Sequence, residues 1–283
     1  MNKIGIIGAG TMGNGIAHVS ALAGFDTVLM DINDEFVDSG LSTIRKNLKL
    51  QVKKEKISQA DMDISLEKIE IGTDYAKVSA CDLVVEAATE NEEIKLDIFK
   101  ELDHICQQRT ILATNTSSIS ITKIARATNR PEQVIGMHFM NPVPIMKLVE
   151  IVRGKKTDDT TTSEVVDLSE KMGKIPIKCN DSPGFISNRI LMPMINEAIF
   201  CLEEGVGSPE AIDSIMKLGM AHPMGPLTLA DLIGLDVCLN IINVLFSDFG
   251  DDKYKPCPLL VKMVEDGHLG RKSEKGFYDY NYK

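Results

Sequence analysis

The chain has 283 residues, of which 43% are apolar and 25% charged, and its formal net charge is -10. This length accommodates two domains, and the composition is ordinary for a soluble globular protein. The acidic balance argues against a nucleic-acid-binding protein, whose footprint is usually a basic face. The six cysteines are scattered without a Cys-x-x-Cys pair, so we expect reduced thiols rather than a zinc or redox site.

The N-terminal segment is apolar but does not have the pattern of a targeting or membrane sequence. The first expected strand begins at about residue 3, which leaves no room for a signal or transit peptide. Residues 4–25 are uncharged, yet they include six glycines together with Asn14 and His18. A strand, turn and helix are therefore predicted there rather than a membrane helix, and we expect a cytoplasmic protein without a membrane partner.

A glycine-rich turn follows the first expected strand. Gly8, Gly10 and Gly13 form a Gly-x-Gly-x-x-Gly pattern, in which the missing Cβ atoms permit a tight turn and close approach of a pyrophosphate. A second apolar strand at 27–30 ends at Asp31, which is placed to accept hydrogen bonds from a ribose diol. No arginine or lysine occurs between Asp31 and Arg45, so the pattern predicts NAD rather than NADP as the cofactor.

Apolar strands alternate with amphipathic helices through the first two-thirds of the chain. This order predicts an α/β fold of the Rossmann type, with a mostly parallel sheet covered on both faces. After Asp181-Ser182-Pro183-Gly184 only helical patterns remain, so we expect an NAD-binding domain at 1–183 and an all-α domain at 184–283. The expected strands are 3–7, 27–30, 69–72, 82–87, 110–114, 133–140, 146–152 and 175–179; the expected helices are 11–23, 34–56, 91–107, 158–173, 209–219, 226–246 and 257–267.

A candidate acid/base pair flanks a loop with two prolines. If two strands return on each other about Pro144, His138 and Glu150 lie six residues on either side and face one another. A histidine backed by a carboxylate is the usual construction of a general base, because the carboxylate fixes the tautomer and stabilises the imidazolium. A purely structural pair that joins two strands explains the same pattern equally well.

Two further segments carry polar groups that could bind ligands. Asn115 and Ser117 follow an apolar strand and are expected to line the crevice at its carboxyl end, whereas Ser118 and Ser120 fit a helix cap. Residues 41–58 contain six basic side chains against one acid, which indicates either a solvated helix face or a site for a phosphorylated substrate. The remaining histidines, at 18, 104, 222 and 268, belong to no metal or catalytic pattern.

The assembled motifs resemble the 3-hydroxyacyl-CoA dehydrogenase family, over residues 4–280. The order and spacing of the motifs carry the likeness more than any single one. They are Gly8–Gly15, Asn115-Thr116-Ser117-Ser118, His138-Phe139-Met140-Asn141-Pro142, Asp181-Ser182-Pro183-Gly184-Phe185, Asn188-Arg189, His222-Pro223-Met224-Gly225-Pro226 and Gly270-Arg271-Lys272. The resemblance implies a two-domain, homodimeric oxidoreductase that transfers hydride between NADH and a short-chain 3-oxoacyl-CoA such as acetoacetyl-CoA.

The resemblance also assigns roles to residues. It implies that His138 is the acid/base, that Glu150 is its partner, and that Ser117 and Asn188 lie near the reacting oxygen. It implies cofactor contacts for Met12, Glu90, Lys95, Asn115, Ser117, Asn141 and Lys272, besides the glycines and Asp31. The basic segment becomes a site for the CoA phosphates, with Lys54 as its representative. Glu274 departs from the glycine that close relatives commonly have, which puts the turn beside Lys272 in question.

Two other functions remain open for the same motifs. One is a dehydrogenase of the same fold that acts on a sugar acid such as gulonate, although the basic segment would then have no purpose. The other is a non-catalytic NAD-binding or structural protein, which would need to have lost the catalytic base. Retention of both His138 and Glu150 argues against this second alternative.

Overall fold

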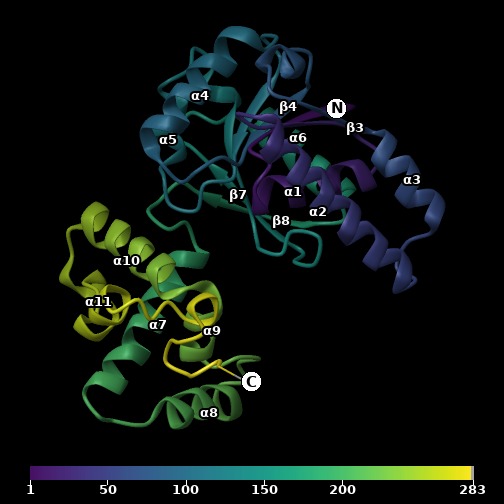
Figure 1. Ribbon diagram of the computed structural model, residues 1–283. Coiled ribbons are helices and arrows are strands. Elements are labelled where there is room, and N and C mark those ends of the chain that lie inside the picture. Colours follow the sequence, from purple (N-terminus) through teal and green to yellow (C-terminus); the bar gives the residue numbers. More distant parts are fainter. Residues whose placement is uncertain (282–283) are drawn as a thin grey trace. The chain divides into compact units, whose positions relative to one another are not determined.

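The computed structural model describes residues 1–281 (Figure 1). The chain divides into two compact units, Met1–Asp181 and Ser182–Lys283. The predicted fold class is confirmed, with a mostly parallel sheet in the first unit and a helical second unit.

The first unit is built on one eight-stranded sheet in the order β3-β2-β1-β4-β5-β6-β7-β8. All neighbouring strands run parallel except β6 and β7, which are antiparallel. The strand order reverses beside β1, and ligands of open α/β sheets bind at such a point, beyond the carboxyl ends of the strands. The strands are β1 (Lys3–Ile7), β2 (Asp26–Met30), β3 (Ile69–Gly72), β4 (Leu83–Glu86), β5 (Ile111–Thr114), β6 (Val134–Phe139), β7 (Leu148–Arg153) and β8 (Ile175–Asn180).

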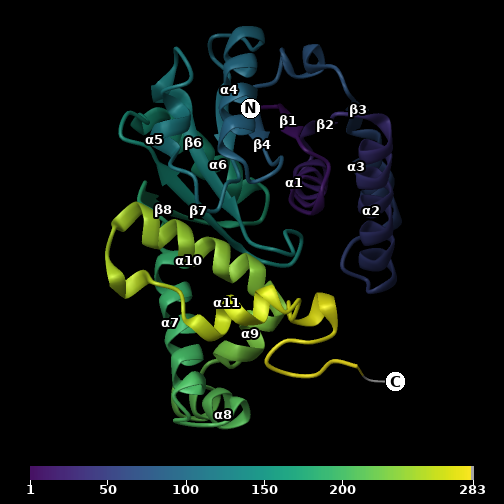
Figure 2. The same cartoon turned by 60° about the vertical axis from the view of Figure 1, so that its left-hand side comes forward.

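Helices cover both faces of this sheet (Figures 1 and 2). Alternate residues of the central strands point to opposite faces, so Ile4 and Ile6 of β1 join the core formed with α1 and α6. Helices α1, α2 and α3 pack on one another, and α4 packs on α5. The helices are α1 (Thr11–Leu22), α2 (Asp34–Lys53), α3 (Gln59–Glu67), α4 (Glu92–Ile105), α5 (Ile121–Ala125) and α6 (Asp159–Lys171).

Two short helices of this unit were absent from the expected ranges: α3 was not predicted at all, and α5 was expected only as the helix that Ser118 or Ser120 would cap. Helix α3 begins with a capping box, in which Ser58 accepts from the backbone N–H of Asp61 and the Asp61 carboxylate accepts from the Ser58 backbone. Helix α5 is capped by Ser120, as the alternative for that residue predicted. Ser118 does not cap a helix, because its hydroxyl donates to Glu90 at 2.9 Å.

The second unit consists of helices around a core of its own. The core includes Ile195, Leu227 and Leu245, all almost completely buried. The prediction of one helix over 226–246 is wrong: Gly234, at φ +105°, separates two helices that meet at 99°. The helices are α7 (Ser187–Glu203), α8 (Pro209–Gly219), α9 (Pro226–Ile233), α10 (Leu235–Phe249) and α11 (Pro258–Glu265).

Among the described residues, no single helix has the length and apolarity needed to cross a membrane. Helices α9 and α10 meet that criterion only when they are taken together across their bend.

Candidate active site

Two glycines of the turn after β1 are required by the fold itself. Gly8 has φ +101°, and a Cβ there would lie 2.6 Å from the carbonyl oxygen of Ala87. A Cβ on Gly13 would lie only 1.7 Å from the carbonyl oxygen of Gly8. Both positions therefore exclude any side chain, because the turn and helix α1 pack directly on these backbone atoms.

Gly10 differs from its two neighbours in the motif. A Cβ on Gly10 would meet no protein atom within 4 Å. The protein itself gives no reason for a glycine at this position, which immediately precedes the N-terminus of the twelve-residue helix α1. Open space beside backbone N–H groups at a helix N-terminus suits the pyrophosphate of a dinucleotide, so the turn fits NAD.

The turn opens onto a cleft of about 670 Å³, lined among others by Gly10, Met12 and Asp31. Asp31 accepts hydrogen bonds from the backbone N–H of Ala9 at 2.6 Å and of Ile32 at 2.7 Å. These bonds hold the carboxylate at the end of β2, where it can accept from a ribose hydroxyl. None of the described residues that line this cleft is basic, so the cleft offers no partner for a 2′-phosphate.

A buried ion pair lies beneath the loop after β4. The Lys95 ammonium is 1% exposed and donates to both carboxylate oxygens of Glu86, at 2.7 and 2.9 Å. It also lies 3.5 Å from the Glu90 carboxylate. Lys95 is therefore enclosed by carboxylates rather than open to the cleft, and Glu86 was not found from the sequence. The signal that could have revealed Glu86 was a lone acid at the end of the apolar run 83–85.

Glu90 joins this ion pair to the segment after β5. Its carboxylate accepts from the Thr116 hydroxyl at 2.6 Å and from the Ser117 backbone N–H at 2.9 Å. Burial would raise the pKa of Glu90, but Lys95 and the hydrogen bonds from Thr116, Ser117 and Ser118 together lower it. Glu90 thus stays ionised and fixes the position of Ser117.

Asn115 ties β5 to the neighbouring strand β6. Its side-chain oxygen accepts from the backbone N–H of Phe139 at 3.0 Å, and its own backbone N–H donates to the backbone carbonyl oxygen of Glu86 at 2.7 Å. The side-chain oxygen is thereby occupied, which leaves the amide NH₂ as the group that can contact a ligand.

The predicted pairing of His138 and Glu150 is present in the sheet. The two residues are direct partners in the antiparallel register of β6 and β7. The His138 Nδ1 lies 2.8 Å from Glu150 Oε2, and both residues are buried. A carboxylate at this distance makes Nδ1 a donor, so Nε2 is the ring nitrogen that can exchange a proton with a substrate.

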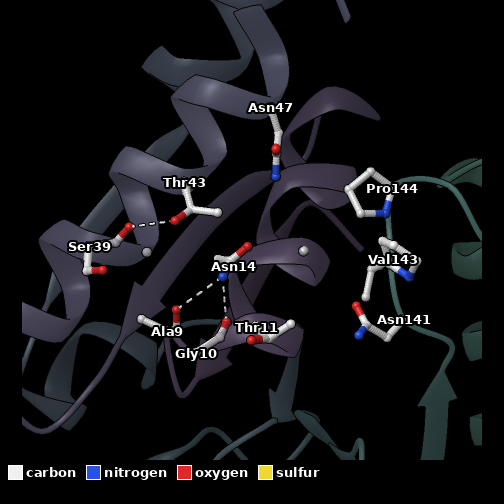
Figure 3. A pocket seen from close by; sticks show the side chains of 13 residues that line it. Ala9, Gly10, Thr11, Asn14, Ser39, Thr43, Asn47, Asn141, Val143 and Pro144 are labelled. Atoms are coloured by element: carbon white, nitrogen blue, oxygen red, sulfur yellow. Dashed lines mark hydrogen bonds between the residues drawn. The ribbon is translucent and has the colours of Figure 1, made fainter. Parts of the chain in front are cut away.

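A second cleft, of about 360 Å³, lies between α1, α2 and the loop after β6 (Figure 3). Asn141 borders it from the loop and Asn47 from α2, while Asn14 is fixed by donating to the carbonyl oxygen of Gly10 at 2.7 Å. Lys54 lies in an adjoining hollow together with Lys56. Asn47 was another polar side chain that the sequence did not single out.

Two residues of the predicted site belong to the second unit. Asn188 is buried in the first turn of α7. Lys272 forms an ion pair with Asp236 and lies in the same short segment as Glu274, which has φ +59°. This left-handed conformation explains why a glycine suits position 274.

The sheet order, the glycine turn after β1 and the acid after β2 define a Rossmann-type dinucleotide-binding protein. The model of the 3-hydroxyacyl-CoA dehydrogenase NAD binding domain matches residues 3–182, and the model of that family's C-terminal domain matches residues 184–280. The chain therefore belongs to the 3-hydroxyacyl-CoA dehydrogenase family, and its cofactor is NAD.

Relatives align over nearly the whole chain. A probable 3-hydroxybutyryl-CoA dehydrogenase of Deinococcus radiodurans is 58% identical, covering 98% of this chain and 100% of that protein. The 3-hydroxybutyryl-CoA dehydrogenase of Bradyrhizobium diazoefficiens is 55% identical, covering 99% and 96% respectively. The crystal structure of (S)-3-hydroxybutyryl-CoA dehydrogenase from Ralstonia eutropha superposes with a TM-score of 0.97 at 51% identity, covering 100% of both chains.

Proposed function

We propose that the protein is an NAD-dependent (S)-3-hydroxybutyryl-CoA dehydrogenase that interconverts acetoacetyl-CoA and (S)-3-hydroxybutyryl-CoA in the cytoplasm. The names and full-length coverage of its relatives support this substrate. The observation that carries the chemistry is the buried pair of His138 and Glu150, with Nδ1 and Oε2 2.8 Å apart. A sugar-acid dehydrogenase of the same fold would not require the hollow that contains Lys54 and Lys56.

The mechanism follows from the orientation of His138. Bound nicotinamide supplies the hydride in reduction and accepts it in oxidation. His138 donates a proton from Nε2 to the substrate oxygen during reduction and removes it during oxidation. Glu150 accepts the Nδ1 hydrogen and stabilises the imidazolium, while Ser117 and Asn188 orient and polarise the oxygen.

The cofactor contacts divide between backbone and side chains. Gly8, Gly10 and Gly13 shape the turn for the pyrophosphate, and Asp31 accepts from the ribose. Glu90 and Lys95 act at the loop after β4. Lys95 acts from beneath this loop, because its ammonium group is paired with the carboxylate of Glu86. The remaining proposed cofactor contacts are Met12, Asn115, Ser117, Asn141 and Lys272.

The two domains of the chain have different functions. Residues 1–183 form the NAD-binding domain, and residues 184–283 form the helical substrate and dimerisation domain of a homodimer. Lys54 contacts the CoA phosphates, and this exposed lysine has no ion-pair partner among the described residues.

The test follows NADH absorbance with two substrates supplied separately. We expect consumption of NADH with acetoacetyl-CoA and no production of NADH from L-gulonate and NAD. Activity on gulonate alone would replace the proposed function by the sugar-acid alternative. Comparing C4, C8 and C16 3-oxoacyl-CoA thioesters then gives the acyl-chain range, and the proposal requires C4 to have the highest kcat/KM.

A further inference from the structure

Glu86, the last residue of β4, is bonded through its carboxylate to three segments of the first unit. Its side chain is fully buried. Oε1 accepts from the backbone N–H of Ala88 and from Lys95 Nζ, both at 2.7 Å. Oε2 accepts from Lys95 at 2.9 Å and from the Thr114 hydroxyl at 2.7 Å. Glu86 therefore joins the loop after β4, helix α4 and the end of β5, and the four donor contacts hold its carboxylate in one orientation.

The Lys95 ammonium lies between two carboxylates that it does not contact equally. It is bonded to both oxygens of Glu86, whereas Glu90 Oε2 is 3.5 Å away, longer than a charge-assisted hydrogen bond of about 2.7–2.9 Å. Because Lys95 is 1% exposed, its charge requires a carboxylate partner inside the protein. Glu86 supplies this partner, and Glu90 is left as the weaker one.

The Ser117 loop (residues 115–118) is bonded to the other oxygen of Glu90. Glu90 Oε1 accepts from the backbone N–H of Ser117 at 2.9 Å, and from the backbone N–H and the hydroxyl of Ser118 at 3.1 and 2.9 Å. The Glu90 side chain is 40% exposed, so it has room to turn, unlike the buried pair beside it. Its bonds to the Ser117 loop therefore depend on Lys95 being neutralised by another carboxylate.

We infer that Glu86 is a positioning residue for the reaction: by holding Lys95, it leaves Glu90 bonded to the Ser117 loop. This inference rests on the proposed function, in which Ser117 orients and polarises the substrate oxygen. Among residues 1–281, Glu90 is the other carboxylate within ion-pair distance of Lys95. Without the Glu86 charge, the buried ammonium draws Glu90 toward itself and the Ser117 loop loses its acceptor. A misplacement of about 1 Å in a catalytic group can cost about 100-fold in rate.

The first test is Glu86→Gln, which keeps the size of the side chain and one acceptor oxygen for Ala88 but removes the charge. We expect kcat for NADH-dependent reduction of acetoacetyl-CoA to fall about 10- to 100-fold at saturating substrates, because the Ser117 loop shifts. The dissociation constant for NADH, measured by fluorescence titration, should change little, because the Ala88 N–H beside the glycine turn keeps its acceptor.

The second test is a rescue by the double variant Glu86→Gln/Lys95→Met. Both buried charges are removed together, so nothing draws Glu90 away from the Ser117 loop, and the double variant should recover most of the lost kcat. Assays at saturating NADH keep any contribution of Lys95 to cofactor affinity out of kcat. A role of Glu86 in stability alone predicts instead that kcat per folded protein does not fall in Glu86→Gln.

Glu86→Asp is a milder variant that keeps the charge balance of the buried pair. Its carboxylate is shorter by one methylene, so it should hold Lys95 less closely and lower kcat in the same direction but by less than Glu86→Gln. This variant decides the question if Glu86→Gln does not fold.

Asp103→Asn is the matched control, because it also removes a carboxylate of α4 from a buried ion pair. Asp103 and Arg130 have side chains 8% and 2% exposed, and Asp103 accepts from Asn129 and Arg130 rather than from the Ser117 loop. The control should lower stability, measured by urea unfolding, and leave kcat unchanged.

Three results would overturn the inference. The first is an unchanged kcat in Glu86→Asp and in folded Glu86→Gln. The second is a double variant as slow as Glu86→Gln, because the attraction between Lys95 and Glu90 would then not be the cause. The third is a crystal structure of Glu86→Gln in which Glu90 still accepts from the Ser117 backbone N–H. If wild type does not reduce acetoacetyl-CoA, the proposed function is refuted, whereas the crystal structure still decides the positioning role of Glu86.

Discussion

The pairing of His138 with Glu150 predicts a specific non-additivity between two substitutions. His138→Gln removes the group that exchanges the proton, and general acid–base catalysis contributes about 10²- to 10⁴-fold to rate. At about 1.36 kcal/mol for each tenfold, this loss corresponds to about 3–5 kcal/mol of transition-state stabilisation. The substitution should leave NADH binding intact, because neither residue lines the cleft that contains Asp31.

Glu150→Gln keeps a hydrogen-bond acceptor for Nδ1 at the position that is now 2.8 Å away, but removes the negative charge. A charge-assisted hydrogen bond is roughly twice as strong as a neutral one, a difference of about 1–2 kcal/mol, or a five- to thirtyfold loss of kcat. Because Glu150 acts through His138, the double variant should be no slower than His138→Gln alone. The assay is NADH absorbance at saturating acetoacetyl-CoA, with NADH affinity measured separately by fluorescence titration.

Additive losses in the double variant would refute this reasoning, because they would mean that Glu150 stabilises the transition state independently of His138. Near-normal turnover of His138→Gln would remove the histidine from the mechanism altogether. A loss of NADH affinity in either variant would indicate a structural role for the pair, which is the alternative that the sequence left open.

Three other predictions follow from the first unit. Asp31→Ala should weaken NADH binding and reduce the preference over NADPH, both measured by fluorescence titration. Gly10→Ala should fold normally but lose NADH affinity, whereas Gly13→Ala should lower the thermal midpoint, because only the second Cβ meets backbone. The Asp103 carboxylate forms an ion pair with Arg130, whose Nε lies 2.7 Å from Oδ1. Burial would raise the pKa of Asp103, but the hydrogen bonds that it accepts from Asn129 and Arg130 lower this pKa. A carboxylate whose pKa is lower in the folded than in the unfolded protein stabilises the fold at pH values above its unfolded pKa. This stabilisation is lost as the pH falls through its folded pKa. Asp103→Asn should therefore destabilise the protein at pH 7 in urea unfolding, and less so near pH 3.

Each of these predictions has a clear contrary result. An unchanged cofactor preference in Asp31→Ala would mean that another residue reads the ribose. Equal stability of the Gly10 and Gly13 variants would contradict the difference in their surroundings. A stability loss in Asp103→Asn that is the same at both pH values would mean that the Asp103 charge is unimportant to folding.

The sequence was most informative where a local pattern determines the contact. The register of His138 and Glu150 follows from a loop centred near Pro144, because antiparallel strands place residues equidistant from the turn opposite one another. The glycine turn was also predictable from the sequence, because the Gly-x-Gly-x-x-Gly spacing corresponds to one local backbone geometry. Both contacts lie within a single hairpin or a single strand-to-helix connection.

Features that depend on tertiary packing could not be predicted. The enclosure of Lys95 arises because α4 packs back against the end of β4, where Glu86 lies nine residues earlier in the chain, whereas the pattern of α4 alone suggests an exposed residue. The break at Gly234 was missed because the apolar periodicity continues through it, and only the positive φ reveals the turn.

The enclosure of Lys95 also separates two responses to ionic strength. Added salt screens an exposed charge such as that of Lys54 far more than a pair whose side chains are 1% and 0% exposed. Raising the salt concentration should therefore increase KM for the thioester while the dissociation constant for NADH changes little. A parallel rise in both constants would mean that solvent ions reach the Glu86–Lys95 pair. The depth of a charge in the fold thus determines which of the two ligands is sensitive to salt.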